Sequence, residues 1–196
     1  MRYGGVIISE LMPSGIRIID RVLGGFPIPS TILVVSDPIA SPELILYNFS
    51  NGGYYFASVK SPKIIETEMR DLGFNSKIIR IDERNILNEI DDISNCKAVV
   101  EFTFDENIAL KLREIAMKNK ILLLLSVLKN WYNDKSLTLL QYLCDGVFII
   151  ESERVGDRFV YKFSIPKMLG GVNMPTFIRF KTKKKILEID TSREVS

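Results

Sequence analysis

Short apolar runs that alternate with amphipathic segments are the feature that most limits how this chain can fold. Runs with the length and composition of buried strands lie at 31–36, 54–58, 77–81, 97–101, 120–127 and 146–151. The segments expected to be helices lie between and before them, at 14–23, 42–50, 61–73, 84–92, 105–119 and 134–143. This alternation is typical of βαβ units, whose parallel strands are buried on both faces. The sequence therefore predicts an α/β protein with a mostly parallel central sheet.

The pattern changes after residue 150. The stretches VGDRFVYKFSIPKM and TFIRFKTKKKILEID alternate apolar and polar residues, which predicts two antiparallel hairpins at one edge of the sheet. No internal repeat or low-complexity segment interrupts the chain of 196 residues. We expect one domain over residues 1–196, with 191–196 frayed.

Composition excludes several kinds of function. The chain has no histidine, which removes histidine acid-base catalysis, Ser-His-Asp and Cys-His arrangements and most transition-metal sites. Its net charge of +2 does not by itself indicate nucleic acid or an anionic membrane as a partner. Cys96 and Cys144 lie in apolar contexts and are expected to be buried free thiols. With neither a signal peptide nor an apolar span long enough to cross a membrane, the protein is expected to be cytoplasmic.

The segment SGIRIIDRVLGGFPIPSTILVVSDPIASPELILYNF resembles the opening of the KaiC-like and RadA-like branch of the RecA-fold ATPases. That family carries T/S-G-x-x-x-L/I-D-x-x-L-G-G-G-x-P, then a strand and a phosphate-binding loop. The matching residues are Ser14, Gly15, Ile19, Asp20, Leu23, Gly24, Gly25 and Pro27. Later stretches agree with the family pattern: YYFASVKSPKIIETEMRDLGF, CDGVFIIE and IPKMLGGVNMPTFIRFKTKKKILEID. The resemblance covers residues 14–190 and implies a three-layer RecA-like fold; the turn PIPS also resembles the archaellum accessory ATPase FlaH.

The phosphate-binding loop of that family is altered here. Alignment of SDPIASPE with G-x-P-G-x-G-K-S/T assigns the loop positions to Ser36, Asp37, Pro38, Ile39, Ala40, Ser41, Pro42 and Glu43. Pro42 stands in place of the lysine and has neither a cation nor an N–H group for a phosphate. Branched Ile39 replaces a glycine that supplies positive φ. We expect Ser41 to cap the following helix and Glu43 to supply a carboxylate where phosphate would otherwise bind, so that the turn is structural.

The resemblance also locates the other catalytic positions. Val59 and Lys60 stand where the family carries carboxylates after its second strand, and Glu101 is the one acid retained, at the end of a strand. Lys167 is retained from the family's K-M-R-G segment, in which Leu169 replaces the arginine. Lys167 is equally well interpreted as a surface hairpin lysine.

Two further groups of residues are candidates for interaction. Trp131 and Tyr132 are expected on a loop after the fifth strand, where aromatic side chains often contact partners, although they could also pack onto the core. Lys181, Lys183, Lys184 and Lys185 form a local basic patch, and such a run is more often solvated surface than a binding site.

These observations favour a catalytically inactive ATPase homologue with no cofactor, acting as a regulatory or scaffolding partner of another protein, of an active paralogue or of a second copy. One alternative is a weak binder of ATP with Mg²⁺, which would use backbone N–H groups of residues 37–41 and Glu101 for the metal. Another is a RadA-like, DNA-associated recombinase paralogue that binds through Trp131, Tyr132 and the lysines at 181–185.

Overall fold

The computed structural model describes residues 10–101, 105–183 and 186–189. Its larger sheet contains β3 (Ser30–Ser36), β4 (Tyr54–Ala57), β5 (Lys77–Arg80), β6 (Lys97–Glu101), β7 (Leu122–Leu128), β8 (Gly146–Val155), β9 (Arg158–Met168), β10 (Met174–Lys183) and β11 (Ile186–Ile189). A separate two-stranded sheet pairs β1 (Leu11–Met12) with β2 (Phe26–Pro27). The helices are α1 (Arg17–Leu23), α2 (Glu43–Ser50), α3 (Pro62–Leu72), α4 (Ile86–Asp91), α5 (Glu106–Asn119) and α6 (Asp134–Leu143), with one 3₁₀ turn, η1 (Pro38–Ala40).

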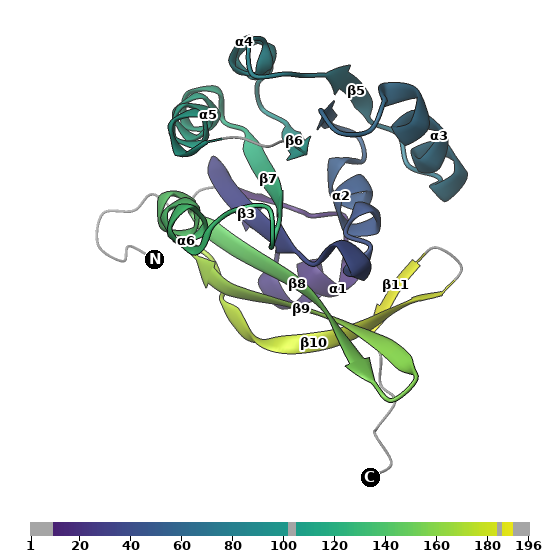
Figure 1. Ribbon diagram of the computed structural model, residues 1–196. Coiled ribbons are helices and arrows are strands. Elements are labelled where there is room, and N and C mark those ends of the chain that lie inside the picture. Colours follow the sequence, from purple (N-terminus) through teal and green to yellow (C-terminus); the bar gives the residue numbers. More distant parts are fainter. Residues whose placement is uncertain (1–9, 102–104, 184–185, 190–196) are drawn as a thin grey trace.

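The strand order of the larger sheet is β11-β10-β9-β8-β3-β7-β6-β4-β5. The strands from β8 to β5 pair in parallel, whereas β8, β9, β10 and β11 pair antiparallel in sequence (Figure 1). Both hairpins expected after residue 150 are present at this edge. The predicted α/β architecture, with a mostly parallel centre and antiparallel strands at the C-terminal edge, is confirmed.

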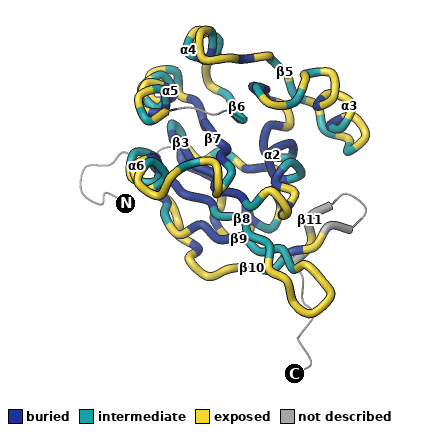
Figure 2. The backbone as a smooth tube through the Cα atoms, in the orientation of Figure 1, coloured by how far each residue is buried: buried dark blue, intermediate teal, exposed yellow. Residues whose placement is uncertain are grey.

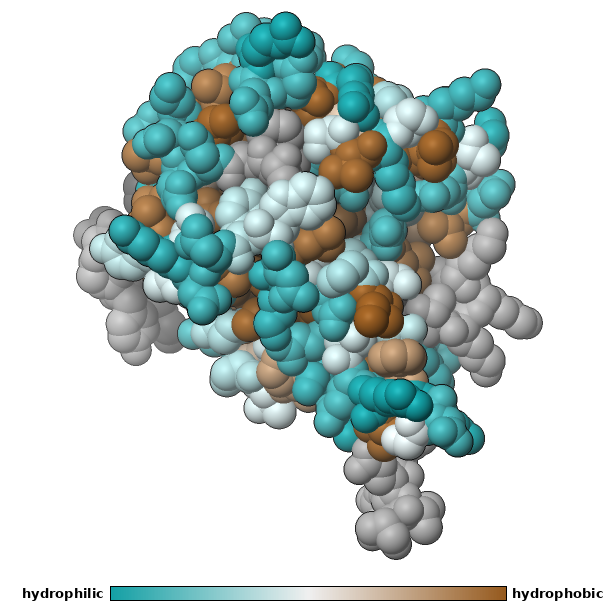
Figure 3. Space-filling model, viewed as in Figure 1, coloured by the Kyte–Doolittle hydropathy of each residue, from teal (hydrophilic) through white to brown (hydrophobic). Residues whose placement is uncertain are grey.

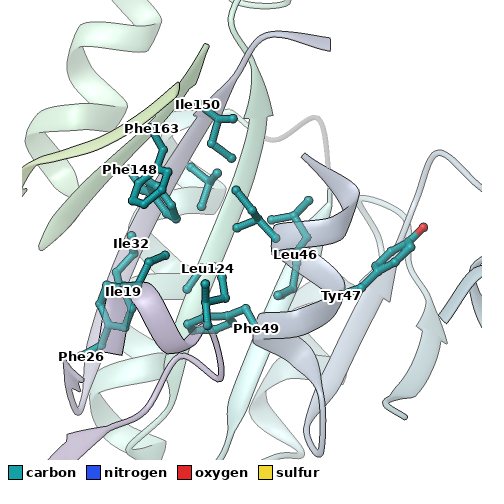
Figure 4. Packing of buried hydrophobic residues seen from close by; sticks show 14 of the residues in the cluster. Ile19, Phe26, Ile32, Leu46, Tyr47, Phe49, Leu124, Phe148, Ile150 and Phe163 are labelled. Carbon is teal, nitrogen blue, oxygen red and sulfur yellow. The ribbon is translucent and has the colours of Figure 1, made fainter. Parts of the chain in front are cut away.

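Two apolar layers lie on opposite faces of the sheet, and β3 contributes to both. Ile32 and Val34 pack with residues of α1, α2 and α3, whereas Leu33 and Val35 pack with residues of α4, α5 and α6. Figure 1 shows the corresponding helices on the two sides of the sheet, and Figure 2 shows buried backbone concentrated in the central strands. Side chains from α1, α2 and several strands meet in the first layer, as Figure 4 shows. The arrangement is therefore helix, sheet and helix.

The first helix begins later than its sequence predicts. Residues 14–16 form a loop rather than the first helical turn, because the Asp20 carboxylate accepts the N–H groups of Ser14 at 2.7 Å and Gly15 at 3.0 Å. Gly15 has a φ of +84° and Gly24, which ends the helix, a φ of +74°. The fold alone therefore accounts for three residues of the N-terminal motif: Gly15, Asp20 and Gly24.

Asp145 links the start of β8 to two other elements. Its Oδ2 atom accepts the Thr31 N–H at 2.9 Å, and its Oδ1 atom accepts from Arg113 Nη2 at 2.7 Å. The neighbouring Gly146 is closely packed, because a Cβ atom there would lie 2.9 Å from Met168 Cε. The Asp-Gly pair therefore has a structural role at the amino end of β8. None of the helices in the described part of the chain has the length and hydropathy that crossing a membrane requires.

Replacing Asp145 should test this role. Asp145→Ala removes a buried acceptor and leaves the Thr31 N–H and the Arg113 guanidinium without their partner, so we expect a loss of about 2 kcal/mol in the free energy of unfolding. Urea denaturation followed by circular dichroism measures it. Asp91→Ala, which breaks an exposed pair with Lys118, is the matched control and should cost much less. Equal losses for the two variants would contradict the prediction.

Candidate functional site

A pocket of about 180 Å³ opens at the carboxyl ends of β3, β4, β6 and β7. In parallel sheets this edge is where ligands usually bind, because the loops that leave the strands converge there. The pocket is lined by Pro38, Pro42, Glu43, Leu46, Val59, Lys60, Glu101, Ser126, Val127, Leu128, Trp131 and Tyr132. The fold therefore brings together part of the set that the sequence singled out, from four separate segments: Pro38, Pro42, Glu43, Val59, Lys60, Glu101, Trp131 and Tyr132.

The loop after β3 forms hydrogen bonds to its own carboxylate. Asp37 Oδ1 accepts the Ile39 N–H at 2.9 Å, and Asp37 Oδ2 accepts from Ser152 Oγ on β8 at 2.6 Å. Although partial burial opposes the shift, these hydrogen bonds lower the pKa of Asp37 and so favour its charged form. The 3₁₀ turn η1 follows directly, with Ile39 inside it. The sequence suggested that Glu43 would supply the carboxylate of this loop. In the structure, the carboxylate that accepts a loop N–H is that of Asp37.

The expected cap at Ser41 is wrong. Ser41 has a left-handed conformation, with φ 48° and ψ 58°, and no side-chain hydrogen bond caps α2. Pro42 occupies the N-cap position, and the helix begins at Glu43. The chain must reverse its path between the 3₁₀ turn and α2, and the left-handed backbone at Ser41 makes that reversal. Ser41 is aligned with a glycine of the family's loop, and it has the left-handed backbone that glycine adopts most easily.

An ion-pair network lies beside the loop. Lys60 Nζ is 3.4 Å from Glu43 Oε1 and 3.1 Å from Glu68 Oε2, and the Tyr47 hydroxyl donates to the same Glu68 oxygen. Figure 4 shows the Tyr47 hydroxyl directed away from the apolar cluster. Burial opposes both shifts, but these contacts lower the pKa of Glu68 and raise that of Lys60, so both stay charged. The family pattern has a lysine in the loop and carboxylates after the second strand. Here the carboxylate of Glu43 lies at the loop, and the cation of Lys60 follows β4.

Glu101 lies at the end of β6, on the floor of the pocket. Burial is the main cause that raises the pKa of its carboxyl group; the Tyr55 hydroxyl and the charge of Lys60 oppose the shift, and the charges of Glu43 and Glu68 add to it. Its Oε2 atom is buried and makes no hydrogen bond of ordinary geometry among the described residues. The buried Tyr55 hydroxyl lies beside this carboxyl group as a donor, but likewise without ordinary geometry. The pKa of Tyr55 is raised by burial first, then by the charge of Glu101 and by this contact. Glu101 is thus a largely buried acid whose neighbouring donor is poorly placed.

Lys167 is not part of this pocket. Its Nζ atom donates to the carbonyl oxygens of Gln141 at 2.9 Å, Tyr142 at 3.1 Å and Cys144 at 2.6 Å. These carbonyls belong to the last turn and the C-cap of α6, where a helix lacks partners for its carbonyl groups and favours a positive charge. These contacts give Lys167 a structural role at the end of α6, which neither interpretation of the sequence predicted.

The interaction candidates are divided between different places. Trp131 is exposed at the rim of the pocket, whereas Tyr132 is partly buried against the second apolar layer. Lys181 is exposed on β10, far along the chain from the pocket segments. Lys183 ends β10, but its side chain lies outside the description, as do Lys184 and Lys185 altogether. The basic patch stays a prediction from the sequence.

Two contacts beside the pocket were not foreseen: those of Glu68 with Lys60 and of Ser152 with Asp37. The apolar face of α3 was visible in the sequence, but nothing local indicates that Glu68 on its other side would reach Lys60. Ser152 lies 115 residues from Asp37, so their contact depends on β8 lying next to β3. Such pairings follow from strand order, which a single sequence does not display residue by residue.

The sheet order, the three layers and the pocket edge together define the fold as the RecA-like α/β class. Among solved structures, a KaiC-like protein from the hyperthermophilic archaeon Pyrococcus horikoshii OT3 superposes with a TM-score of 0.79, over 92% of this chain and 99% of that chain, at 15% identity. At this identity the likeness concerns the fold. No protein-family model and no curated protein matches the sequence.

The raised pKa of Glu101 predicts how the stability of the protein depends on pH. Because its pKa is higher in the folded than in the unfolded chain, the folded state holds the proton more tightly, and stability falls as pH rises through the folded pKa. Glu101→Gln removes this dependence, so the variant should be more stable than the natural protein at neutral pH, with a smaller difference near the ordinary glutamate pKa. Urea unfolding at both pH values measures this.

Glu151→Gln is the matched control for that experiment. Glu151 lies on β8 and pairs with Lys129 at 3.1 Å and Lys162 at 3.7 Å, so its replacement removes favourable contacts and should not stabilise the protein. If Glu101→Gln is less stable than the natural protein at neutral pH, the prediction is wrong. The contacts of the carboxylate with Tyr55 and Lys60 then outweigh the cost of its burial.

The helix cap at Lys167 gives a second prediction. Lys167→Met keeps the aliphatic stem but removes the donor for three carbonyl groups, and we expect a loss of about 1–2 kcal/mol in the free energy of unfolding. Chemical denaturation measures the change. Lys118→Met, which removes one exposed pair with Asp91, should cost less. No difference between the two lysine variants would argue against the cap.

Proposed function

We propose that this protein is a catalytically inactive homologue of the RecA/KaiC-like ATPases that acts as a regulatory or scaffolding partner of another protein. The observation that carries the proposal is the start of α2, where such a fold would hold phosphate. Pro42 has no N–H group there, and Asp37 already accepts the Ile39 N–H. A phosphate would find no lysine in the loop, no N–H group at Pro42 and the Ile39 N–H already bonded.

The charges around the pocket support the same conclusion. Asp37, Glu43 and Glu101 surround the place where phosphates would lie, and the one cation of the pocket lining, Lys60, is already bonded to Glu43 and Glu68. Bringing a polyphosphate next to these carboxylates would add repulsion in a partly buried site. The residues present therefore do not fit ATP with Mg²⁺, although Glu101 alone could contact a metal ion.

Exposed apolar side chains around the pocket support a protein partner. Ile39 is 52% exposed, Val59 62% and Trp131 58%. Val59 and Trp131 line the pocket itself, and Ile39 adjoins Pro38 in its wall. Figure 3 shows hydrophobic side chains in several separate groups between hydrophilic ones on the face of the molecule seen in Figure 1. Aromatic and aliphatic residues that ring a pocket are typical of protein interfaces.

Nucleotide titration tests the proposal. Isothermal titration calorimetry with ATP or ADP and Mg²⁺ should give no saturable heat up to millimolar nucleotide, and a phosphate-release assay should give no turnover above the buffer rate. Saturable binding in the micromolar range with phosphate release would overturn the proposal and favour the ATP-binding alternative. Tight, salt-dependent binding of single-stranded DNA would instead favour the recombinase alternative.

A further inference from the structure

We propose that the pocket at the carboxyl ends of β3, β4, β6 and β7 accepts a basic side chain, arginine or lysine, presented by the protein partner. The inference rests on the proposed function, because it specifies the chemistry of the partner at the same site. It follows from the charge of the pocket, from an acceptor there that lacks a well-placed donor and from the apolar residues at its rim.

The charge of the site is negative. Glu43 and Glu68 both bond to Lys60, so one ammonium group compensates two carboxylates. Glu101 then adds a further acid to the lining; the charge of Lys60 acts favourably on it, and the charges of Glu43 and Glu68 act unfavourably. An added cation would relieve this repulsion, whereas an added anion would increase it. The site therefore selects against phosphate and carboxylate ligands.

The poorly satisfied oxygen of Glu101 points to a further hydrogen-bond donor. Buried polar atoms nearly always have a well-placed partner, and one that does not is costly in the free protein. Glu101 Oε2 makes no hydrogen bond of ordinary geometry among the described residues, although the Tyr55 hydroxyl lies beside the carboxyl group, and Glu101 lines the pocket. A guanidinium or ammonium group combines a positive charge with several donors and has no acceptor, so it would satisfy this oxygen without creating a new unpaired group.

The walls suit the stem of a long basic side chain. Leu46, Val59 and Leu128 give the pocket an apolar lining, and Trp131 and Tyr132 close one side. Arginine and lysine bury their methylene groups along apolar surface while the charged end reaches a polar partner. Aromatic rings beside the entrance add a favourable cation–π contact. A volume of about 180 Å³ accommodates one side chain of this kind.

The rim argues for a protein rather than a free amine. A small cation would leave Ile39, Val59 and Trp131 exposed to water. A protein surface that inserts one basic anchor would cover these residues, and a buried anchor ringed by apolar contacts is the usual arrangement at the centre of an interface. We therefore assign the basic group to a partner protein.

Trp131 provides the measurement, because it is the only tryptophan of the chain and lies at the pocket rim. The probes are acetyl-Leu-Arg-Leu-amide, the same peptide with neutral citrulline in place of arginine, and acetylarginine amide. Each is titrated against the natural protein, Glu101→Gln and the control Glu151→Gln, with Trp131 fluorescence as the readout. Backbone amide shifts of residues 99–101 and 126–128 in an NMR titration verify that the fluorescence change arises in the pocket.

We expect saturable binding of the arginine peptide to the natural protein and to Glu151→Gln. Binding should weaken at least tenfold with the citrulline peptide and with Glu101→Gln, which the stability prediction expects to fold. No saturation by the arginine peptide at millimolar concentration, or equal affinity of the citrulline peptide, would overturn the proposal. Equal affinity of acetylarginine amide would assign the site to small cations and also overturn it.

The outcomes separate this inference from the function on which it rests. If neither nucleotide nor the arginine peptide binds, the basic-anchor proposal fails while the inactive-homologue proposal stands. If ATP with Mg²⁺ binds and is turned over, the proposed function fails, whatever the peptide does.

Discussion

The rest of the structure depends on the burial of β3 between two parallel neighbours. All seven residues of the strand are buried, and its backbone pairs with β7 on one side and β8 on the other. Ser36, its last residue, therefore lies opposite Leu128 and Ile150. The ladder continues beyond the strand end, because the Asp37 N–H donates to the Ile150 carbonyl and the Lys129 N–H to that of Ser36. The loop that follows thus starts from a rigidly held point.

From that point the loop is stabilised by its own polar groups. Asp37 receives hydrogen bonds from Ile39 and from Ser152, and Ser41 turns the chain into α2. A phosphate-binding loop of this fold class has the opposite need, since its N–H groups must remain free and point inward. In this strand-turn-helix frame, several polar groups of the loop are instead bonded within the protein.

The sequence allowed the main features of the site to be predicted, but not how its charges are paired. The loss of the loop lysine at Pro42 and the retained acid at Glu101 could be read directly from aligned positions. The ion pair of Glu43 could not be read from the sequence, because its partner Lys60 lies in a different segment, after the end of β4. The cap expected at Ser41 followed a sound local rule for Ser-Pro-Glu, yet the path of the chain imposed a left-handed backbone there. Lys167 likewise found its partners on α6, 23–26 residues away.

The sequence by itself determined where most strands and helices form, because apolar periodicity and helix stops such as Gly73 act over a few residues or a single turn. It also determined that Pro42 has no N–H group to donate, whatever surrounds it. Only the tertiary structure decided which charges meet at the carboxyl edge of the sheet. That outcome depends on the order and register of four strands, which bring Glu43, Lys60 and Glu101 together and leave one buried oxygen of Glu101 without a well-placed donor among the described residues.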